Sequence, residues 1–160
     1  MSTRSCIILK LRESDINKKK QFAVTKLPVP LKSWDAYHEE TAKEFSKQVR
    51  LNKPYIGIYC DSDGYPSGVG KVLKEKFTNY DDILNLIVGG DCSFVWFDGV
   101  RHYANRPNES WEWIKPTKED SPIEIVKQID NEYAYLFENG EWKMKHWDDK
   151  DFHEYNENED

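Results

Sequence analysis

The chain has 160 residues, a net charge of −6, and 38% hydrophobic residues, with aromatic residues at 14% of the chain. This length can bury a core without disulfides, and the negative charge argues against binding nucleic acid or an anionic membrane through their phosphate groups. The three cysteines have no CxxC spacing, and no apolar run approaches the ~18 residues of a membrane span, so we expect a cytoplasmic protein without cofactor or metal.

Two short apolar runs predict a pair of neighbouring strands. They extend from Cys6 to Leu11 and from Tyr55 to Cys60. Between them the sequence predicts a polar tip over residues 13–20, a short strand over residues 21–25, and an amphipathic helix from Trp34 to Val49.

Two helices are predicted in the middle of the chain. The first has one apolar face, formed by Val69, Val72, Leu73 and Phe77, and the second begins at the cap candidate Asn79 and ends at the glycines 89–90.

Two dipeptides predict β-hairpins with type I′ turns. Asp98-Gly99 lies between apolar residues 93–97 and 100–103, and Asn139-Gly140 lies between alternating residues 133–137 and 141–144.

The remaining segments are predicted to be less regular. Residues 105–118 are expected to form a loop, and a helix is expected to begin at Ser121-Pro122. Residues 148–160 are so rich in charged and polar side chains that we expect an acidic tail that is mobile when the protein is alone.

The Gly-rich loop over residues 61–71 is the candidate ligand site. Backbone amides and a helix N-terminus in such a loop can hold a phosphate, and the candidate residues are Asp63, Gly64, Gly68, Gly70 and Lys71. The loop is not a P-loop, because five residues separate Gly64 from Gly70 and a valine follows Lys71. Turn formation and close packing explain the glycines more simply than anion binding does.

Other polar and aromatic residues extend the list of candidates. Arg4 and Arg106 each lie beside a predicted strand and could complete the ligand site or pair with Asp63. Trp111 and Trp113 lie in a polar segment and either fix it to the core or contact a partner protein. Neither His102 nor the aspartates at 61 and 63 belong to a recognisable catalytic or metal-binding pattern, so no catalytic residue is assigned.

Three motifs resemble those of a group of small proteins from phages and mobile elements. They are Ser2-Thr-Arg-Ser5, Tyr59-Cys60 followed by Asp63-Gly-Tyr-Pro-Ser-Gly-Val-Gly-Lys71, and Tyr133-Ala-Tyr-Leu-Phe-Glu-Asn-Gly-Glu-Trp-Lys143. Where such proteins have Cys-His-Trp-Asp, this chain has Cys60-Asp-Ser-Asp63, so the role of that histidine is not carried over. Against this pattern, residues 13–54 are interpreted as an insertion and the acidic tail as an extension.

These observations predict an α+β fold with a mainly antiparallel sheet of about five to seven strands and two or three helices packed on one face. Residues 1–147 are expected to form one domain. The function we expect is that of a small acidic binding protein of phage type in the cytoplasm of a bacterial host, where it blocks a host protein and does not act as an enzyme. The alternative is binding or cleavage of a nucleotide or another phosphorylated ligand at the Gly-rich loop.

Overall fold

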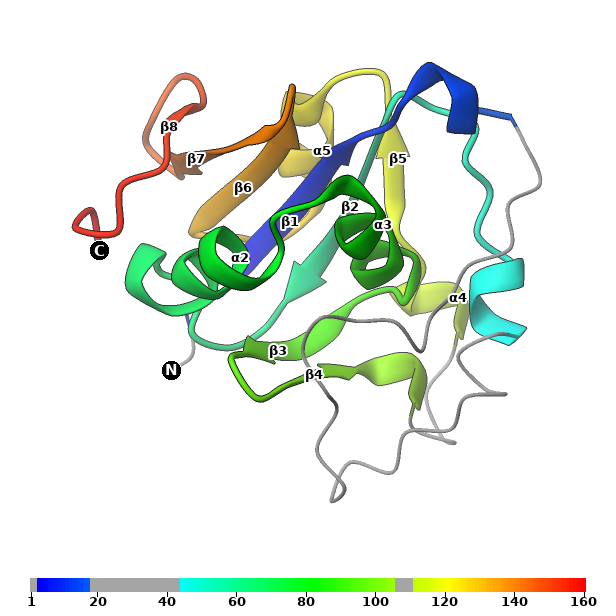
Figure 1. Cartoon of the computed structure of the whole chain (residues 1–160), viewed down its shortest axis with the longest axis horizontal. Coiled ribbons are helices and arrows are strands. Elements are labelled where there is room, and N and C mark those ends of the chain that lie inside the picture. The colour runs from blue at the N-terminus through cyan, green and yellow to red at the C-terminus, as the bar shows by residue number, and fades with distance from the viewer. Residues whose placement is uncertain (1–2, 18–43, 106–110) are drawn as a thin grey trace.

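One mixed β-sheet connects the segments that the computed structural model describes, which are residues 3–17, 44–105 and 111–160 (Figure 1). The order of the strands is β4-β3-β2-β1-β6-β7-β8, and β5 pairs with β2 beside this path. The strands are β1 (Ser5–Lys10), β2 (Tyr55–Cys60), β3 (Cys92–Trp96), β4 (Gly99–His102), β5 (Thr117–Glu119), β6 (Tyr133–Glu138), β7 (Glu141–His146) and β8 (His153–Glu154).

Most neighbouring strands are antiparallel. The predicted pairing of the first two apolar runs is confirmed, because β1 and β2 pair antiparallel with Ile7 opposite Ile58. β1 also pairs with β6 in parallel, and β2 meets β3 in parallel at Cys60 and Cys92. The described residues therefore have the predicted α+β architecture with a mainly antiparallel sheet.

Two of the helices begin where the sequence provides a side-chain cap. Asn79 accepts a hydrogen bond from the backbone N–H of Asp82 at 3.0 Å, and Ser121 accepts one from the N–H of Glu124 at 3.3 Å. These contacts confirm both predicted starts. The helices are α2 (Lys71–Lys76), α3 (Tyr80–Val88), α4 (Trp111–Ile114) and α5 (Pro122–Gln128), and the π-helical turn Pro66–Gly70 precedes α2.

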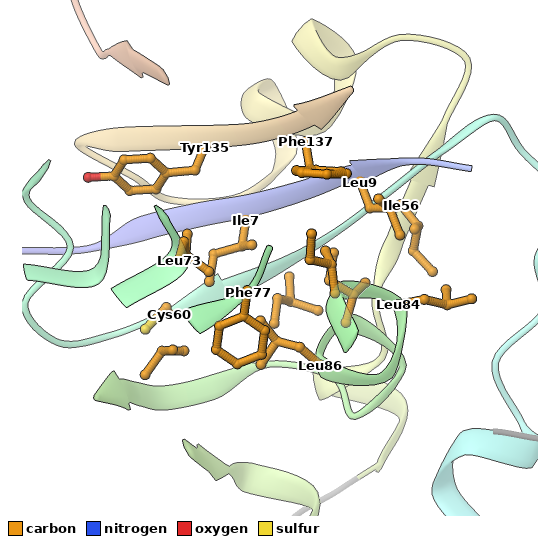
Figure 2. Close-up of a cluster of buried hydrophobic side chains, with 14 of the residues drawn as sticks. Ile7, Leu9, Ile56, Cys60, Leu73, Phe77, Leu84, Leu86, Tyr135 and Phe137 are labelled. Atoms are coloured by element: carbon orange, nitrogen blue, oxygen red, sulfur yellow. The ribbon is translucent and has the colours of Figure 1, made fainter. Parts of the chain in front are cut away.

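The two faces of the sheet are both covered. On one face, Ile7 and Leu9 of β1 pack in the large core with α2 and α3, as Figure 2 shows for Leu73 and Leu84. On the other face, Cys6 and Ile8 pack against α5 through Ile125 and Ile129. The predicted packing of helices on one face is therefore wrong for α5. The physical reason lies in residues 6–9, whose unbroken apolar run is typical of a strand that is buried on both faces.

Only one of the two predicted turns has the expected geometry. Asn139 and Gly140 have φ angles of 53° and 82°, which confirms a type I′ turn between β6 and β7. Trp96 pairs with Gly99, so the turn between β3 and β4 is formed by Phe97 and Asp98, neither of which has a positive φ. The type I′ prediction for Asp98-Gly99 is wrong, because the strand pairing shifts the turn by one residue.

Other predictions differ from the structure or lie outside it. The segment expected to be a loop over residues 105–118 contains α4 and the start of β5. The strand predicted over residues 21–25 lies outside the described residues, as does the helix from Trp34 except for its end, where residues 44–47 are helical.

The acidic tail also differs from the expectation. It forms β8 against β7 and continues beside the turn that precedes α2, as Figure 1 shows at the C-terminus. Its charged composition does indicate little burial, but Tyr155 packs against the large core and supplies an apolar anchor.

Candidate functional site

The Gly-rich loop leaves the carboxyl end of β2 and remains paired with β3. The N–H of Asp61 donates to the carbonyl of Cys92 at 3.1 Å, and the N–H of Ser62 donates to the carbonyl of Ser93 at 2.8 Å. The first part of the loop is therefore an extension of the sheet, which fixes the position of Asp63.

Asp63 is held by three hydrogen bonds inside the protein. Its Oδ2 accepts from the indole N–H of Trp96 at 3.1 Å, and its Oδ1 accepts from the hydroxyl of Tyr65 at 3.3 Å. Its backbone carbonyl accepts from the N–H of Val69 at 2.7 Å. The nearby Asp63 carboxylate also raises the pKa of Tyr65. The Asp63 carboxylate thus binds two side chains.

The glycines of the loop allow close packing. A Cβ atom at Gly64 would lie 2.7 Å from the Cβ of Ser5, and one at Gly70 would lie 2.9 Å from ring atoms of both Tyr135 and Tyr155. The carbonyl of Gly64 also accepts a hydrogen bond from the Tyr135 hydroxyl at 2.6 Å. A side chain at 64 or 70 would therefore force the loop or its neighbours to shift.

The amides that a phosphate would need bind acceptors within the loop. The N–H groups of Gly68 and Gly70 both point to the carbonyl of Tyr65, at 2.9 and 3.4 Å, and the N–H of Lys71 donates to the carbonyl of Gly68. This arrangement does not form the amide cradle that the sequence suggested.

One donor pair of the loop does hold an anionic group, which belongs to the tail. The backbone N–H of Ser67 donates to Oδ1 of Asp160 at 2.8 Å, and the Ser67 hydroxyl binds Oδ2 of the same carboxylate. Lys71 Nζ lies 3.8 Å from a carboxylate oxygen of Glu157. Sequence reasoning missed Ser67, Asp160 and Glu157, because nothing in the local sequence indicates contacts between residues so far apart.

The two candidate arginines do not join this site in the described structure. The side chain of Arg4, which directly precedes β1, lies 2.9 Å from a carboxylate oxygen of Asp130 and does not pair with Asp63. Arg106 lies outside the described residues.

The two candidate tryptophans have different environments. The ring of Trp111 packs edge to face against Phe45, with the centroids 5.6 Å apart. The side chain of Trp113 is 85% exposed, although the next residue, Ile114, is buried and its carbonyl accepts the N–H of Asp91 at 2.8 Å. Helix α4 is thus fixed on one side and presents an indole ring on the other.

Two further ionisable residues, His102 and Asp91, have structural partners. The His102 ring is buried with Nε2 2.8 Å from the carbonyl of Leu86. Asp91 accepts the N–H of Tyr59 at 3.0 Å, and burial raises the pKa of its carboxyl group to about 7. Across residues 3–17, 44–105 and 111–160, no three His, Cys, Asp or Glu side chains meet in an arrangement that could hold a metal ion.

No family model matches the chain, and neither the curated proteins nor the solved structures contain a match. None of the helices in the described part of the chain has the length and apolar character that a membrane span needs.

Proposed function

We propose that this chain is a small acidic binding protein that engages a partner protein through a surface centred on Trp113. The observation that carries this proposal is the 85% exposure of that indole on a short helix whose next residue is buried. Exposed tryptophans on a fixed backbone are typical of the residues that dominate protein interfaces, because they bury a large area at a small entropic cost.

The phage-type role extends this proposal and is supported by the sequence motifs alone. On that resemblance, the partner is a host protein whose activity the chain blocks in the bacterial cytoplasm. The net charge of −6 favours a partner with a positively charged contact surface, since complementary charge raises the rate of association.

A pull-down from bacterial lysate tests the Trp113 surface when it includes a matched control. Trp147 is also exposed, at 66%, and it directly follows β7 in the sequence. Figure 1 shows β7 and α4 on opposite sides of the molecule. We expect the wild-type chain and Trp147→Ala to capture the same stoichiometric partner, and Trp113→Ala to lose it. Capture that is insensitive to Trp113→Ala, or no capture at all, would contradict the proposal.

The second candidate function is binding or cleavage of a nucleotide-like ligand at the Gly-rich loop. One observation favours it, namely that the N–H and hydroxyl of Ser67 hold the carboxylate of Asp160, with Lys71 nearby. A thermal-shift screen with nucleotides discriminates the two functions, because a ligand at one hundred times its Kd stabilises a protein by about 2.7 kcal/mol. Incubation of any stabilising nucleotide with the protein, followed by chromatography, then separates binding from cleavage.

A further inference from the structure

The tail of the chain binds the rest of the protein in the manner of a peptide ligand. Its strand β8 adds to β7, with Glu154 opposite Lys143 and His153 opposite Met144. The strand order places β8 outside β7, so the tail covers a β-strand that would otherwise form the edge of the sheet. Addition of a strand to an edge is a common mode of peptide recognition, in which the backbone provides affinity and side-chain pockets provide specificity.

Tyr155 is the side chain that fits a defined place on this surface. Its hydroxyl donates to the carbonyl of Pro66 at 2.7 Å, and its ring lies so close to Gly70 that a Cβ atom there would be 2.9 Å away. The next residue, Asn156, directs its N–H to the sulfur of Met144 at 3.2 Å. The glycine at 70 therefore leaves the space into which an aromatic side chain fits.

Two carboxylates complete the contact. Asp160 accepts hydrogen bonds from the N–H and hydroxyl of Ser67, and Glu157 lies 3.8 Å from Nζ of Lys71. A tyrosine followed by acidic side chains is thus the pattern that this surface recognises within its own chain.

We propose that the edge of β7 together with residues 66–71 is a binding site for an extended acidic peptide of a partner protein, with a tyrosine ahead of its carboxylates. Residues 153–160 occupy this site when the partner is not bound. The site is distinct from the Trp113 surface, and the inference does not depend on the proposed function.

The contacts of the tail are weak enough to be exchanged. β8 has two residues, and the Lys71–Glu157 pair is long and solvent-exposed, which limits its contribution to stability. The covalent link nevertheless gives the tail an effective concentration on the order of 1 mM. The tail of a second copy makes the same contacts, but at micromolar concentration it cannot displace the attached tail. A peptide from another protein must therefore have a higher intrinsic affinity for the site than the tail has.

The experiment compares the 160-residue chain with a Tyr155→Ala/Asp160→Asn variant of the same length, in which the contacts of the tail are weakened. A fluorescent peptide with the sequence of residues 148–160 serves as the probe, and fluorescence anisotropy measures its affinity. We expect the weakened variant to bind this peptide at least tenfold more tightly than the wild-type chain does. A peptide in which alanine replaces the tyrosine should bind at least fivefold more weakly, as should the weakened variant that also carries Ser67→Ala/Lys71→Glu.

Two outcomes would overturn the inference. One is a folded weakened variant that binds the peptide no better than it binds a scrambled peptide. The other is a dimer, seen by light scattering, whose subunits exchange tails, because the occupant would then be a second copy. If the weakened variant does not fold, the wild-type chain is titrated with the peptide to about 5 mM, above the effective concentration of the tail. An unchanged NMR signal of the chain's own Asn156 amide, which leaves the site when the tail is displaced, would then reject the site.

Discussion

The indole N–H of Trp96 donates to Oδ2 of Asp63 at 3.1 Å, and this bond connects β3 to a loop residue with a φ angle of 54°. Aspartate and asparagine adopt this left-handed conformation more readily than most other residues. Asp63 therefore combines two structural functions, because it makes the turn after β2 and fixes that turn to the neighbouring strand.

Two replacements of Asp63 should distinguish the contribution of its hydrogen bonds to stability from the contribution of its charge. Asp63→Ala removes the acceptors of Trp96 and Tyr65 and places alanine at a positive φ, so we expect a loss of about 1–3 kcal/mol in the free energy of unfolding. Asp63→Asn keeps an acceptor and tolerates the same backbone angle, and should remain within about 1 kcal/mol of the wild type. Urea denaturation measures both variants. Equal losses for the two would show that the charge of Asp63, and not its hydrogen bonds, stabilises the loop.

Two glycines should respond differently to alanine. At Gly140, with a φ of 82°, an added Cβ atom meets no atom within 4 Å, so Gly140→Ala should lose only about 1 kcal/mol through backbone strain. At Gly64 the added atom would lie 2.7 Å from the Cβ of Ser5 and 2.8 Å from the carbonyl of Thr3, and we expect a loss of about 3 kcal/mol. Thermal unfolding compares the two variants directly. A Gly64→Ala protein as stable as Gly140→Ala would contradict the close packing of the loop on β1.

Local patterns were sufficient to predict the elements whose structure depends on neighbouring residues. Asn139-Gly140 specifies a turn by its own φ preferences, and Asn79 caps a helix with a side chain that needs only the next three residues. The turn at Phe97-Asp98 could not be predicted in this way, because its position depends on how β3 and β4 pair.

The candidate site depends on contacts between distant parts of the chain. Sequence reasoning identified the loop over residues 61–71 and favoured turn formation and close packing of its glycines over phosphate binding. The position of Gly70 beside Tyr135 and Tyr155 agrees with that packing, but the sequence could not name these neighbours. Tyr155 and Asp160 lie in a segment whose composition indicates mobility. Their docking requires Pro66 and Ser67 to be placed by the fold, and composition contains no information about that placement.

Replacement of the two tryptophans of α4 should have different effects on the free energy of unfolding, because one packs against the protein and the other is exposed. Trp111→Ala removes an edge-to-face contact with the buried ring of Phe45, and we expect a loss of about 1–3 kcal/mol. Trp113→Ala removes a side chain that is 85% exposed, so its effect should stay within about 0.5 kcal/mol. Differential scanning calorimetry measures both variants. A destabilised Trp113→Ala protein would show that this indole packs against the chain and is unsuited to be the centre of a partner surface.

The Asp91 carboxyl group should make the protein less stable as pH rises. Burial raises its pKa from 3.8 to about 7, while the hydrogen bond from Tyr59 opposes the change. The folded state then binds a proton more tightly than the unfolded state does, so the free energy of unfolding should fall between about pH 4 and pH 7 through this group. Asp91→Asn keeps an acceptor for Tyr59 and should be more stable than the wild type at about pH 8, by on the order of 1 kcal/mol. Urea denaturation at about pH 4 and at about pH 8 tests this prediction. It is contradicted if the difference in free energy of unfolding between the wild type and Asp91→Asn is the same at the two pH values.

The docking of the tail should have its own pH dependence through His153. Nε2 of this residue lies 3.1 Å from a carboxylate oxygen of Asp149 and 3.3 Å from one of Glu159, and Nδ1 lies 2.8 Å from the Glu154 carbonyl. Partial burial lowers the pKa of His153, but these partners raise it by more, so its net shift is upward from 6.5. The resulting stabilisation is complete below about pH 6.5 and is lost as pH rises through the folded value.

The carboxylate of Asp149, which accepts the hydrogen bond from His153, sets the lower limit of this pH range. The N–H of His146 and the imidazole of His153 lower the pKa of Asp149 below 3.8, so its contribution is present above that value and is lost as pH falls through the folded pKa. Hydrogen exchange at the Asn156 amide, corrected for its intrinsic pH dependence, should therefore show more protection at about pH 5.5 than at about pH 8. His153→Gln removes the titrating group and should remove this difference, whereas His146→Gln should keep most of it. Equal protection of the wild-type amide at both pH values would show that His153 does not hold the tail.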